Sequence, residues 1–169
     1  MEILTYILDG QLAHKDSMGN GRVIKAGEVQ GMSAGTGVTH SESNASKTDA
    51  CHLLQIWIMP HTQSVKSTYS EWLPSGKKNE WAVAASEEGK GGAISIHQDA
   101  KMLVAVSDKD TTLQVDIASK RFGWLQIAKG SAKVGDAVLE QGDGVAFSGD
   151  AVTQITATPG SEVLLFDLA

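Results

Sequence analysis

The stretch Arg22-Val23-Ile24-Lys25-Ala26-Gly27-Glu28-Val29-Gln30-Gly31-Met32-Ser33 contains a short apolar run, a turn of glycine and an acidic residue, and a second short run. A similar arrangement returns over residues 137–148, where Gln141-Gly142-Asp143-Gly144 takes the place of Ala26-Gly27-Glu28-Val29. Glycine and acidic residues favour tight turns because they tolerate unusual backbone angles. The repetition predicts two copies of one small β-barrel.

The rest of the chain continues this pattern of short runs and turns. No long window keeps an apolar period of about 3.6 residues, and close-spaced β-branched runs indicate an all-β sandwich or barrel. The polar residues 60–80 are predicted to connect two β units, and residues 87–92 to form a flexible hairpin tip. The predicted strands cover residues 3–8, 21–24, 52–59, 81–85, 93–97, 103–107, 112–117, 123–128, 131–134, 144–147, 154–157 and 162–167.

Composition restricts the function classes. The chain has 169 residues, and 20 Asp and Glu against 14 Lys and Arg give a formal net charge of −6. Direct binding to nucleic acid or to an anionic membrane is not expected, because phosphate contacts need clustered Lys and Arg. The single Cys51 excludes an internal disulfide and suits a reducing compartment. No apolar run approaches the roughly 20 residues of a spanning helix, and the first residues lack signal-peptide features, so a cytoplasmic protein is expected.

The segment Gly35-Thr36-Gly37-Val38-Thr39-His40-Ser41-Glu42 carries the candidate chemistry. In a strand, residues two apart point to the same face, so His40 and Glu42 would offer an imidazole nitrogen and a carboxylate oxygen side by side. That pair suits a divalent metal such as Fe, Mn, Ni or Cu. Two ligands alone do not make a catalytic site, which needs about three or four. A hydrogen-bonded surface pair therefore stays the alternative.

With these residues in view, the chain resembles the pirin family, including bacterial pirin-like quercetinases. The resemblance is specific over residues 1–60 and continues more weakly to residue 168. Its motifs are Met1-Glu2-Ile3-Leu4-Thr5-Tyr6-Ile7-Leu8-Asp9-Gly10, His14-Lys15-Asp16-Ser17-Met18-Gly19-Asn20-Gly21, Gly27-Glu28-Val29-Gln30-Gly31-Met32-Ser33-Ala34-Gly35-Thr36-Gly37-Val38-Thr39-His40-Ser41-Glu42 and His52-Leu53-Leu54-Gln55-Ile56-Trp57-Ile58.

The resemblance implies two cupin barrels with a metal in the N-terminal one. The family's ligands are a His-x-His pair and a later His-x-Glu pair, and only the second is present, as His40 and Glu42. The chain is therefore expected to lack the family's first strands, to have an incomplete N-terminal barrel and to bind metal weakly. We expect a truncated N-terminal cupin over residues 1–68 and a C-terminal cupin without metal ligands over residues 69–169.

The function implied is that of a quercetin 2,3-dioxygenase, which opens a flavonol ring with O₂, weakened or inactive in this form. Glu42 would be the catalytic residue, and His40 and Glu42 would hold the divalent metal, with Fe preferred over Ni, Mn, Cu or Zn. The alternative is a regulator that senses redox state or metal and binds a partner protein. Exposed barrel edges would favour a homodimer.

For the remaining candidate residues, we expect positions near the site or structural roles. Glu2 is expected near the metal without binding it, and His14 at the edge of the site or in a surface loop. The four Trp residues, Trp57 among them, are expected to serve packing.

Overall fold

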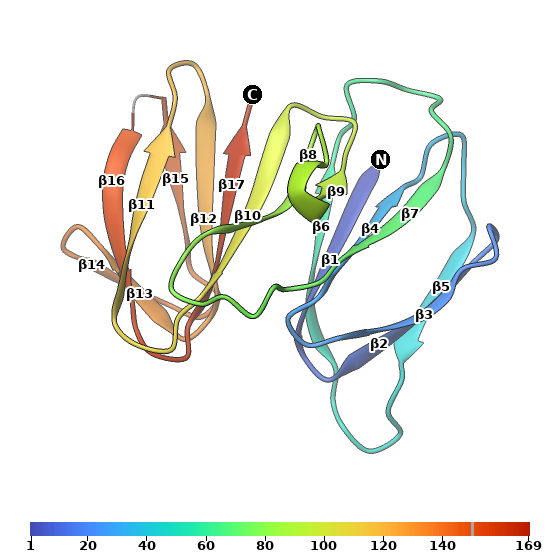
Figure 1. The fold of residues 1–169 in the computed structure, drawn as a ribbon, viewed down its shortest axis with the longest axis horizontal. Coiled ribbons are helices and arrows are strands. Elements are labelled where there is room, and N and C mark those ends of the chain that lie inside the picture. The colour runs from blue at the N-terminus through green and yellow to red at the C-terminus, as the bar shows by residue number, and fades with distance from the viewer. Residues whose placement is uncertain (150) are drawn as a thin grey trace. The chain divides into compact units, whose positions relative to one another are not determined.

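The computed structural model describes residues 1–149 and 151–169, and it confirms the all-β fold class (Figure 1). The strands are β1 (Glu2–Asp9), β2 (Gln11–Asp16), β3 (Gly21–Lys25), β4 (Val29–Ser33), β5 (His40–Asn44), β6 (His52–Ile58), β7 (Thr68–Trp72), β8 (Ala82–Ser86), β9 (Ile94–Ser95), β10 (Ala100–Val106), β11 (Thr111–Ile117), β12 (Phe122–Lys129), β13 (Ser131–Val134), β14 (Ala137–Glu140), β15 (Gly144–Ser148), β16 (Ala151–Ala157) and β17 (Glu162–Leu168). A short 3₁₀ helix, η1, covers Lys90–Gly92. Among these described residues, no helix has the length and apolar character needed to cross a membrane.

The chain divides into two compact units. Unit 1 contains residues 1–74 and 87–98, and unit 2 contains residues 75–86 and 99–169. The boundary expected between residues 68 and 69 stays a prediction about domains.

Unit 1 is built from two antiparallel sheets. One has the strand order β6-β1-β4-β7, and the other has the order β3-β2-β5. Leu4 and Tyr6 of β1 are fully buried on one face of the strand, and Ile7 on the other packs with Leu12 and Ile24. The predicted connector over residues 60–80 is wrong in part, because it contains β7, which pairs with β4.

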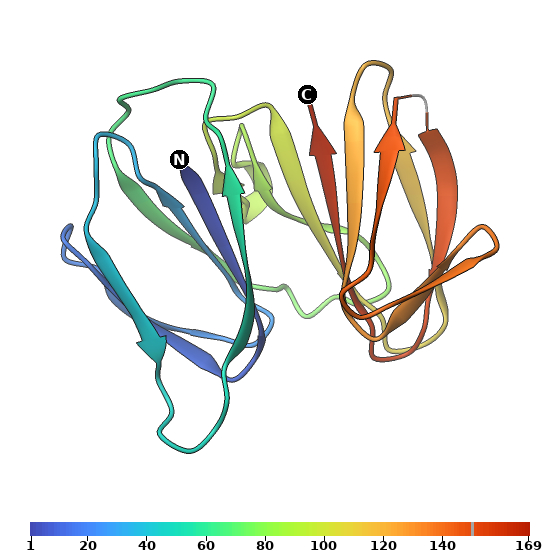
Figure 2. The same cartoon turned by 180° about the vertical axis from the view of Figure 1, so that it is seen from behind.

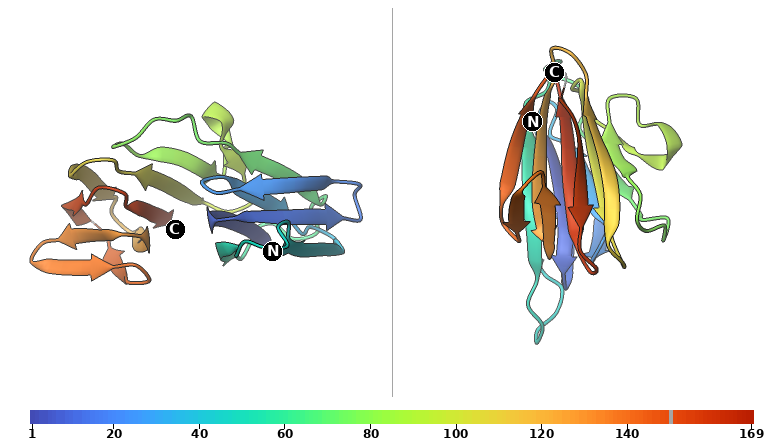
Figure 3. Two further views of the ribbon diagram at one scale, coloured as in Figure 1. Left: turned by 90° about the horizontal axis from the view of Figure 1, so that it is seen from below. Right: turned by 90° about the vertical axis from the view of Figure 1, so that its left-hand side faces the viewer.

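Unit 2 has a larger apolar interior. Strands β15-β12-β17-β10-β8 lie in one sheet, and β11-β16-β13-β14 form the facing one. Figure 3 shows its orange-to-red strands side by side. The alternating burial of β11 places Leu113, Val115 and Ile117 in a core that also contains Leu125 and Ile155. This burial removes apolar surface from water and is the main source of the unit's stability.

The turn between β3 and β4 in unit 1 has a defined set of hydrogen bonds. The Gly27 amide donates to the carbonyl of Ile7 at 2.8 Å, and the Ile7 amide donates to the carbonyl of Glu28 at 3.2 Å. The Glu28 side chain accepts the Lys25 amide at 2.8 Å. Gly27 has a φ of 84°, which a residue with a side chain rarely adopts.

The turn between β14 and β15 in unit 2 repeats this set bond for bond. The Gly142 amide donates to the carbonyl of Ile127 at 2.9 Å, and the Ile127 amide donates to the carbonyl of Asp143 at 2.9 Å. The Asp143 side chain accepts the Glu140 amide at 2.9 Å. Gly142 also has a positive φ, of 96°. The two turns seen in the sequence are therefore the same structural device, as expected for two copies of one barrel.

Strand pairing extends the correspondence and shows where it stops. In unit 1, β1 pairs with β4 and β6, and β2 pairs with β3 and β5. In unit 2, β12 pairs in the same way with β15 and β17, and β13 with β14 and β16. Strands β10 and β11 then cover the outer edges of β17 and β16. In the described part of unit 1, no strand covers the corresponding edges of β6 and β5, so the N-terminal barrel is the incomplete one (Figures 1 and 2).

Candidate metal centre

The register of β2 against β5 gathers four functional side chains. His14 lies directly opposite Glu42, and Asp16 lies opposite His40. Since residues two apart share a face of a strand, all four side chains belong to one face of this sheet. His14, Asp16, His40 and Glu42 are called the site cluster below.

The carboxylate of Glu42 is held by two amide side chains from the other sheet of unit 1. Gln30 on β4 donates to Oε1 at 2.8 Å, and Gln55 on β6 donates to Oε2 at 3.0 Å. Gln30 and Gln55 both pair with Thr5 of β1, so they lie in one row across that sheet. The site cluster therefore faces the interior between the two sheets, and the Glu42 side chain stays 19% exposed.

His14 is the buried centre of the cluster. Its side chain has no exposed surface, and its ring packs between Tyr69, with 4.9 Å between centroids, and His40, with 5.6 Å. Its Nε2 lies 3.3 Å from Oδ2 of Asp16. Its Nδ1 lies 3.7 Å from Oε1 of Glu42, which is beyond hydrogen-bond distance, and this buried atom has no hydrogen-bond partner.

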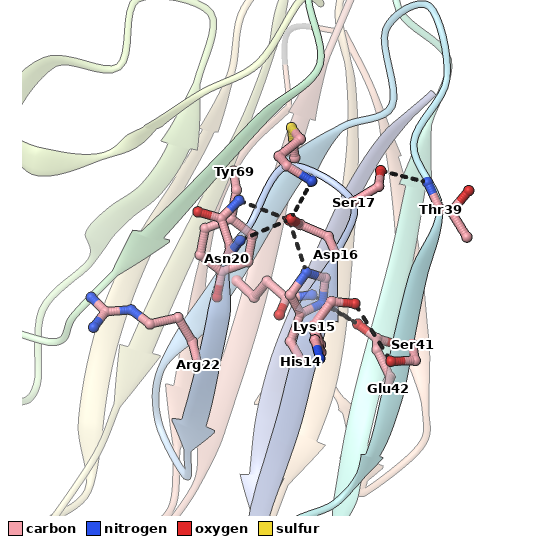
Figure 4. Close-up of polar contacts among 12 residues, drawn as sticks. His14, Lys15, Asp16, Ser17, Asn20, Arg22, Thr39, Ser41, Glu42 and Tyr69 are labelled. Atoms are coloured by element: carbon pink, nitrogen blue, oxygen red, sulfur yellow. Dashed lines mark hydrogen bonds and ion pairs between the residues drawn. The ribbon is translucent and has the colours of Figure 1, made fainter.

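Both carboxylate oxygens of Asp16 accept hydrogen bonds. Its carboxylate accepts the Met18 amide at 2.9 Å, the Asn20 amide at 3.0 Å and the Asn20 side chain at 2.8 Å, besides His14. Figure 4 shows Asn20 and His14 directed at this carboxylate. Burial raises the pKa of Asp16, but the hydrogen bonds from Asn20, His14 and Met18 outweigh it and lower the pKa from 3.8 to about 2. The carboxylate is therefore ionised at neutral pH.

Tyr69 closes the cluster on the side of β7. Its hydroxyl donates to Oε1 of Glu71 at 2.8 Å, and Arg22 donates to the same oxygen at 3.0 Å. Burial, together with the hydrogen bond and negative charge of Glu71, raises the pKa of the Tyr69 hydroxyl well above its usual value. Tyr69 therefore stays neutral and acts as a fixed aromatic wall against His14.

The predicted ligands lie as their spacing requires, on one face of β5, with His40 exposed at its start. Their role as metal ligands stays a prediction. The sequence placed His14 at the edge of the site or in a surface loop, whereas it lies on β2 with a fully buried side chain. The signal was available in the sequence, since His14 and Asp16 have the same spacing of two as His40 and Glu42.

Two other expectations need correction. Glu2 lies on the opposite face of β1 from Thr5, where Ser33 donates to its Oε2 at 2.5 Å and His97 lies 3.5 Å from its Oε1. It is therefore turned away from the site cluster. Trp57 does not serve packing alone: it is 65% exposed, and its indole N–H donates to Gln55 at 3.1 Å.

The donor set fits a divalent metal in chemistry but is not yet gathered around one. His40 and Glu42 offer a nitrogen and an oxygen as metal ligands, and the buried Nδ1 of His14 is a further possible ligand atom that has no hydrogen-bond partner. Within residues 1–149 and 151–169, no three His, Cys, Asp or Glu side chains already form a cluster that could hold a metal ion. Binding would need these side chains to draw together.

Comparison with known proteins covers almost the whole chain. Residues 1–58 match the family described as Pirin, and residues 83–168 match the one described as Quercetinase C-terminal cupin domain. Quercetin 2,3-dioxygenase of Escherichia coli K12 is 40% identical over 168 residues, which cover 99% of this chain and 72% of that protein. A pirin-like protein of Caulobacter vibrioides is 35% identical over 173 residues, covering 100% of this chain and 74% of the relative.

Solved structures agree with this relationship. The crystal structure of YhhW from Escherichia coli has a TM-score of 0.92 and 39% identity, and the match covers 99% of this chain and 71% of that one. A structure of the bacterial pirin YhhW in complex with nickel(II) has a TM-score of 0.90 at 39% identity, with 99% and 72% covered.

Proposed function

Because this chain belongs to the pirin family, we propose that it binds a divalent metal through His40 and Glu42 and acts as a flavonol 2,3-dioxygenase of the quercetin type. One observation carries the proposal. The carboxylate of Glu42 is fixed inside the unit by Gln30 and Gln55, at 2.8 and 3.0 Å, beside a second imidazole-bearing strand. The names of the relatives, and the nickel(II) in one of them, support the substrate class and the metal.

The metal, when bound, would supply Lewis-acid polarisation of the flavonol oxygens and an open position for O₂. The remaining tasks belong to the protein. Glu42 would accept the proton of the flavonol hydroxyl, a role supported by the two amide donors that orient its oxygens and leave further lone pairs free. Gln30 and Gln55 would hold the carboxylate in place while the proton transfers.

Trp57 would give the substrate a surface to lie on. Its ring is 65% exposed, and its indole N–H is held by Gln55, which also contacts Glu42. A flavonol is a flat aromatic molecule, and such molecules stack favourably on an indole face. The ring is thus fixed next to the proposed proton acceptor.

We propose that metal binding by the 169-residue chain is weak, with Fe, Ni, Mn, Cu and Zn as the candidates, because His40 and Glu42 by themselves leave most coordination positions to water. Slow flavonol turnover follows from low occupancy. Elemental analysis of the purified protein gives the occupancy, and loss of the flavonol absorbance after loading with each metal gives the activity.

The decisive comparison uses matched variants. E42Q keeps the size of Glu42, removes its charge and replaces one of its two acceptor oxygens by an amide donor, whereas E140Q makes the same change at an exposed position of unit 2. We expect E42Q and H40A to lose metal and flavonol turnover, and E140Q to retain both. Metal binding without any turnover would refute the enzyme and leave the metal-sensing, partner-binding alternative. No metal binding to the unmodified chain would refute both.

A further inference from the structure

We propose that His14 is a third ligand, so that Nδ1 of His14, His40 and Glu42 bind one cation together. The inference rests on the proposed function, because it takes His40 and Glu42 as ligands of the same metal. It assigns a role to the one buried imidazole of the site cluster, whose Nδ1 has no hydrogen-bond partner and lies 3.7 Å from Oε1 of Glu42.

The first support is that the buried Nδ1 of His14 has no hydrogen-bond partner. The Asp16 carboxylate accepts hydrogen bonds, so Nε2 of His14 carries the proton that points to it, and in this tautomer Nδ1 carries the lone pair. That lone pair faces Oε1 of Glu42 at 3.7 Å, with no donor supplied to Nδ1. Buried polar atoms are rarely left unpaired, because each costs free energy. A cation between the two atoms would give Nδ1 the partner that it lacks, beside an Oε1 that already accepts a hydrogen bond from Gln30.

The second support is the way His14 is oriented. A metal-binding histidine usually donates its other ring N–H to a carboxylate, which fixes the tautomer and makes the ligating nitrogen more basic. His14 has this arrangement through Asp16, and Asp16 is itself held by Met18 and Asn20. The Tyr69 ring packs on His14 with 4.9 Å between centroids and limits its rotation.

The third support is distance. Metal–nitrogen and metal–oxygen bonds are about 2.0–2.2 Å, so two donors on one cation lie at most about 4 Å apart and about 3.0–3.5 Å at common angles. The 3.7 Å between Nδ1 and Oε1 needs only a small contraction. The rings of His14 and His40 have centroids 5.6 Å apart but are stacked at 21°, so the exposed His40 ring has to turn to bring a nitrogen to the same cation.

The test counts nitrogen ligands with Cu²⁺ as the probe and the full 169-residue chain. Electron paramagnetic resonance reports each coordinated imidazole nitrogen through its hyperfine splitting, and calorimetry gives the affinity. H14F keeps an aromatic ring between Tyr69 and His40 but removes both nitrogens. H52A is the control, since His52 is an exposed histidine of unit 1. D16N removes the charge of the carboxylate that orients His14 and leaves the three proposed ligands in place, and its affinity is measured under conditions where the variant is folded.

We expect two nitrogens for the unmodified chain and for H52A, and one for H14F and for H40A. The affinity of D16N should fall roughly 10- to 100-fold, as is usual when a partner of a metal-binding histidine is removed. If H14F keeps two nitrogens and its affinity stays within twofold while H40A weakens binding, the inference is wrong and the proposed function stands. If H40A and E42Q bind Cu²⁺ as H52A does, the proposed site fails with it.

If H14F does not fold, the unmodified chain and D16N still test whether His14 is a ligand. A single nitrogen in the unmodified chain, or unchanged affinity in D16N, would overturn the assignment of His14. Two nitrogens together with a weakened D16N would support it.

Discussion

Asp16 offers a direct test of how the site cluster is held together. Its side chain is fully buried, yet hydrogen bonds from Met18, Asn20 and His14 keep its pKa at about 2 instead of 3.8. Because the folded-state pKa lies below the ordinary value, the folded state prefers the ionised form. The stabilisation is therefore complete above about pH 4 and is lost as the pH falls toward 2.

The size of the effect follows from the pKa difference. A shift of one pKa unit corresponds to about 1.4 kcal/mol, so Asp16 contributes about 2 kcal/mol to the free energy of unfolding at pH 7. The variant D16N removes this contribution, and we expect its urea midpoint to fall by on the order of 1 M. At pH 2, which is near the folded-state pKa, Asp16 of the unmodified chain is about half protonated and most of this contribution is lost, so the two proteins should differ little.

The assay must report on unit 1 alone. Pulsed hydrogen–deuterium exchange at increasing urea, in the presence of a chelator, gives the unfolding midpoint of peptides from residues 1–74. D49N is the control, since Asp49 accepts a surface hydrogen bond from Ser46 at 2.9 Å and its loss should cost less than about 0.5 kcal/mol. An equal loss for D16N at pH 2 and pH 7, or no loss at either, would refute the reasoning.

Three further predictions follow from the fold. Arg121 donates to both carboxylate oxygens and the carbonyl of Asp99, and to the carbonyl of Asp167 and its carboxylate, the last at 2.6 Å. R121A should therefore destabilise unit 2 by about 2 kcal/mol, measured from peptides of residues 99–169, and an unchanged midpoint would contradict this. Gly10 has a φ of 79°, and a Cβ there would strike the carbonyl of Ala50, whereas a Cβ at Gly19 would meet open space. G10A should therefore lower the free energy of unfolding by at least about 2 kcal/mol, and by more than G19A. Equal unfolding midpoints of G10A and G19A would refute this. The uncovered edges of β5 and β6 predict a dimer that grows with protein concentration in sedimentation velocity, and a monomer at every concentration would count against it.

The sequence predicted the fold best at two of its turns. The glycine–acid turns at residues 27–28 and 142–143 predicted a duplicated barrel, and both have the same backbone hydrogen bonds. Strands β2 and β7 were missed because their inward faces are partly polar, with His14 and Asp16 on one and Tyr69 and Glu71 on the other. Hydrophobic alternation identifies a strand only when the interior it faces is apolar.

The site was predictable only in part, because its geometry depends on the pairing of distant strands. Spacing along β5 sufficed to place His40 and Glu42 on one face. The position of His14 opposite Glu42 depends on the register of β2 against β5, 28 positions along the chain, which no local pattern sets. The hydrogen bonds of Gln30 and Gln55 to Glu42 likewise need the second sheet, and neither residue type is distinctive by itself.

The uncovered edges of β5 and β6 have a consequence for the chemistry. These strands carry Glu42 and Gln55, and the Gln55 side chain donates a hydrogen bond to Glu42 at 3.0 Å. The unpaired strand edges of unit 1 therefore border the site cluster. Any backbone that adds to either strand would exclude water from the cluster and strengthen its electrostatic attraction for a cation. Assembly and cation uptake would then be thermodynamically linked, and each would raise the equilibrium constant of the other by the same factor.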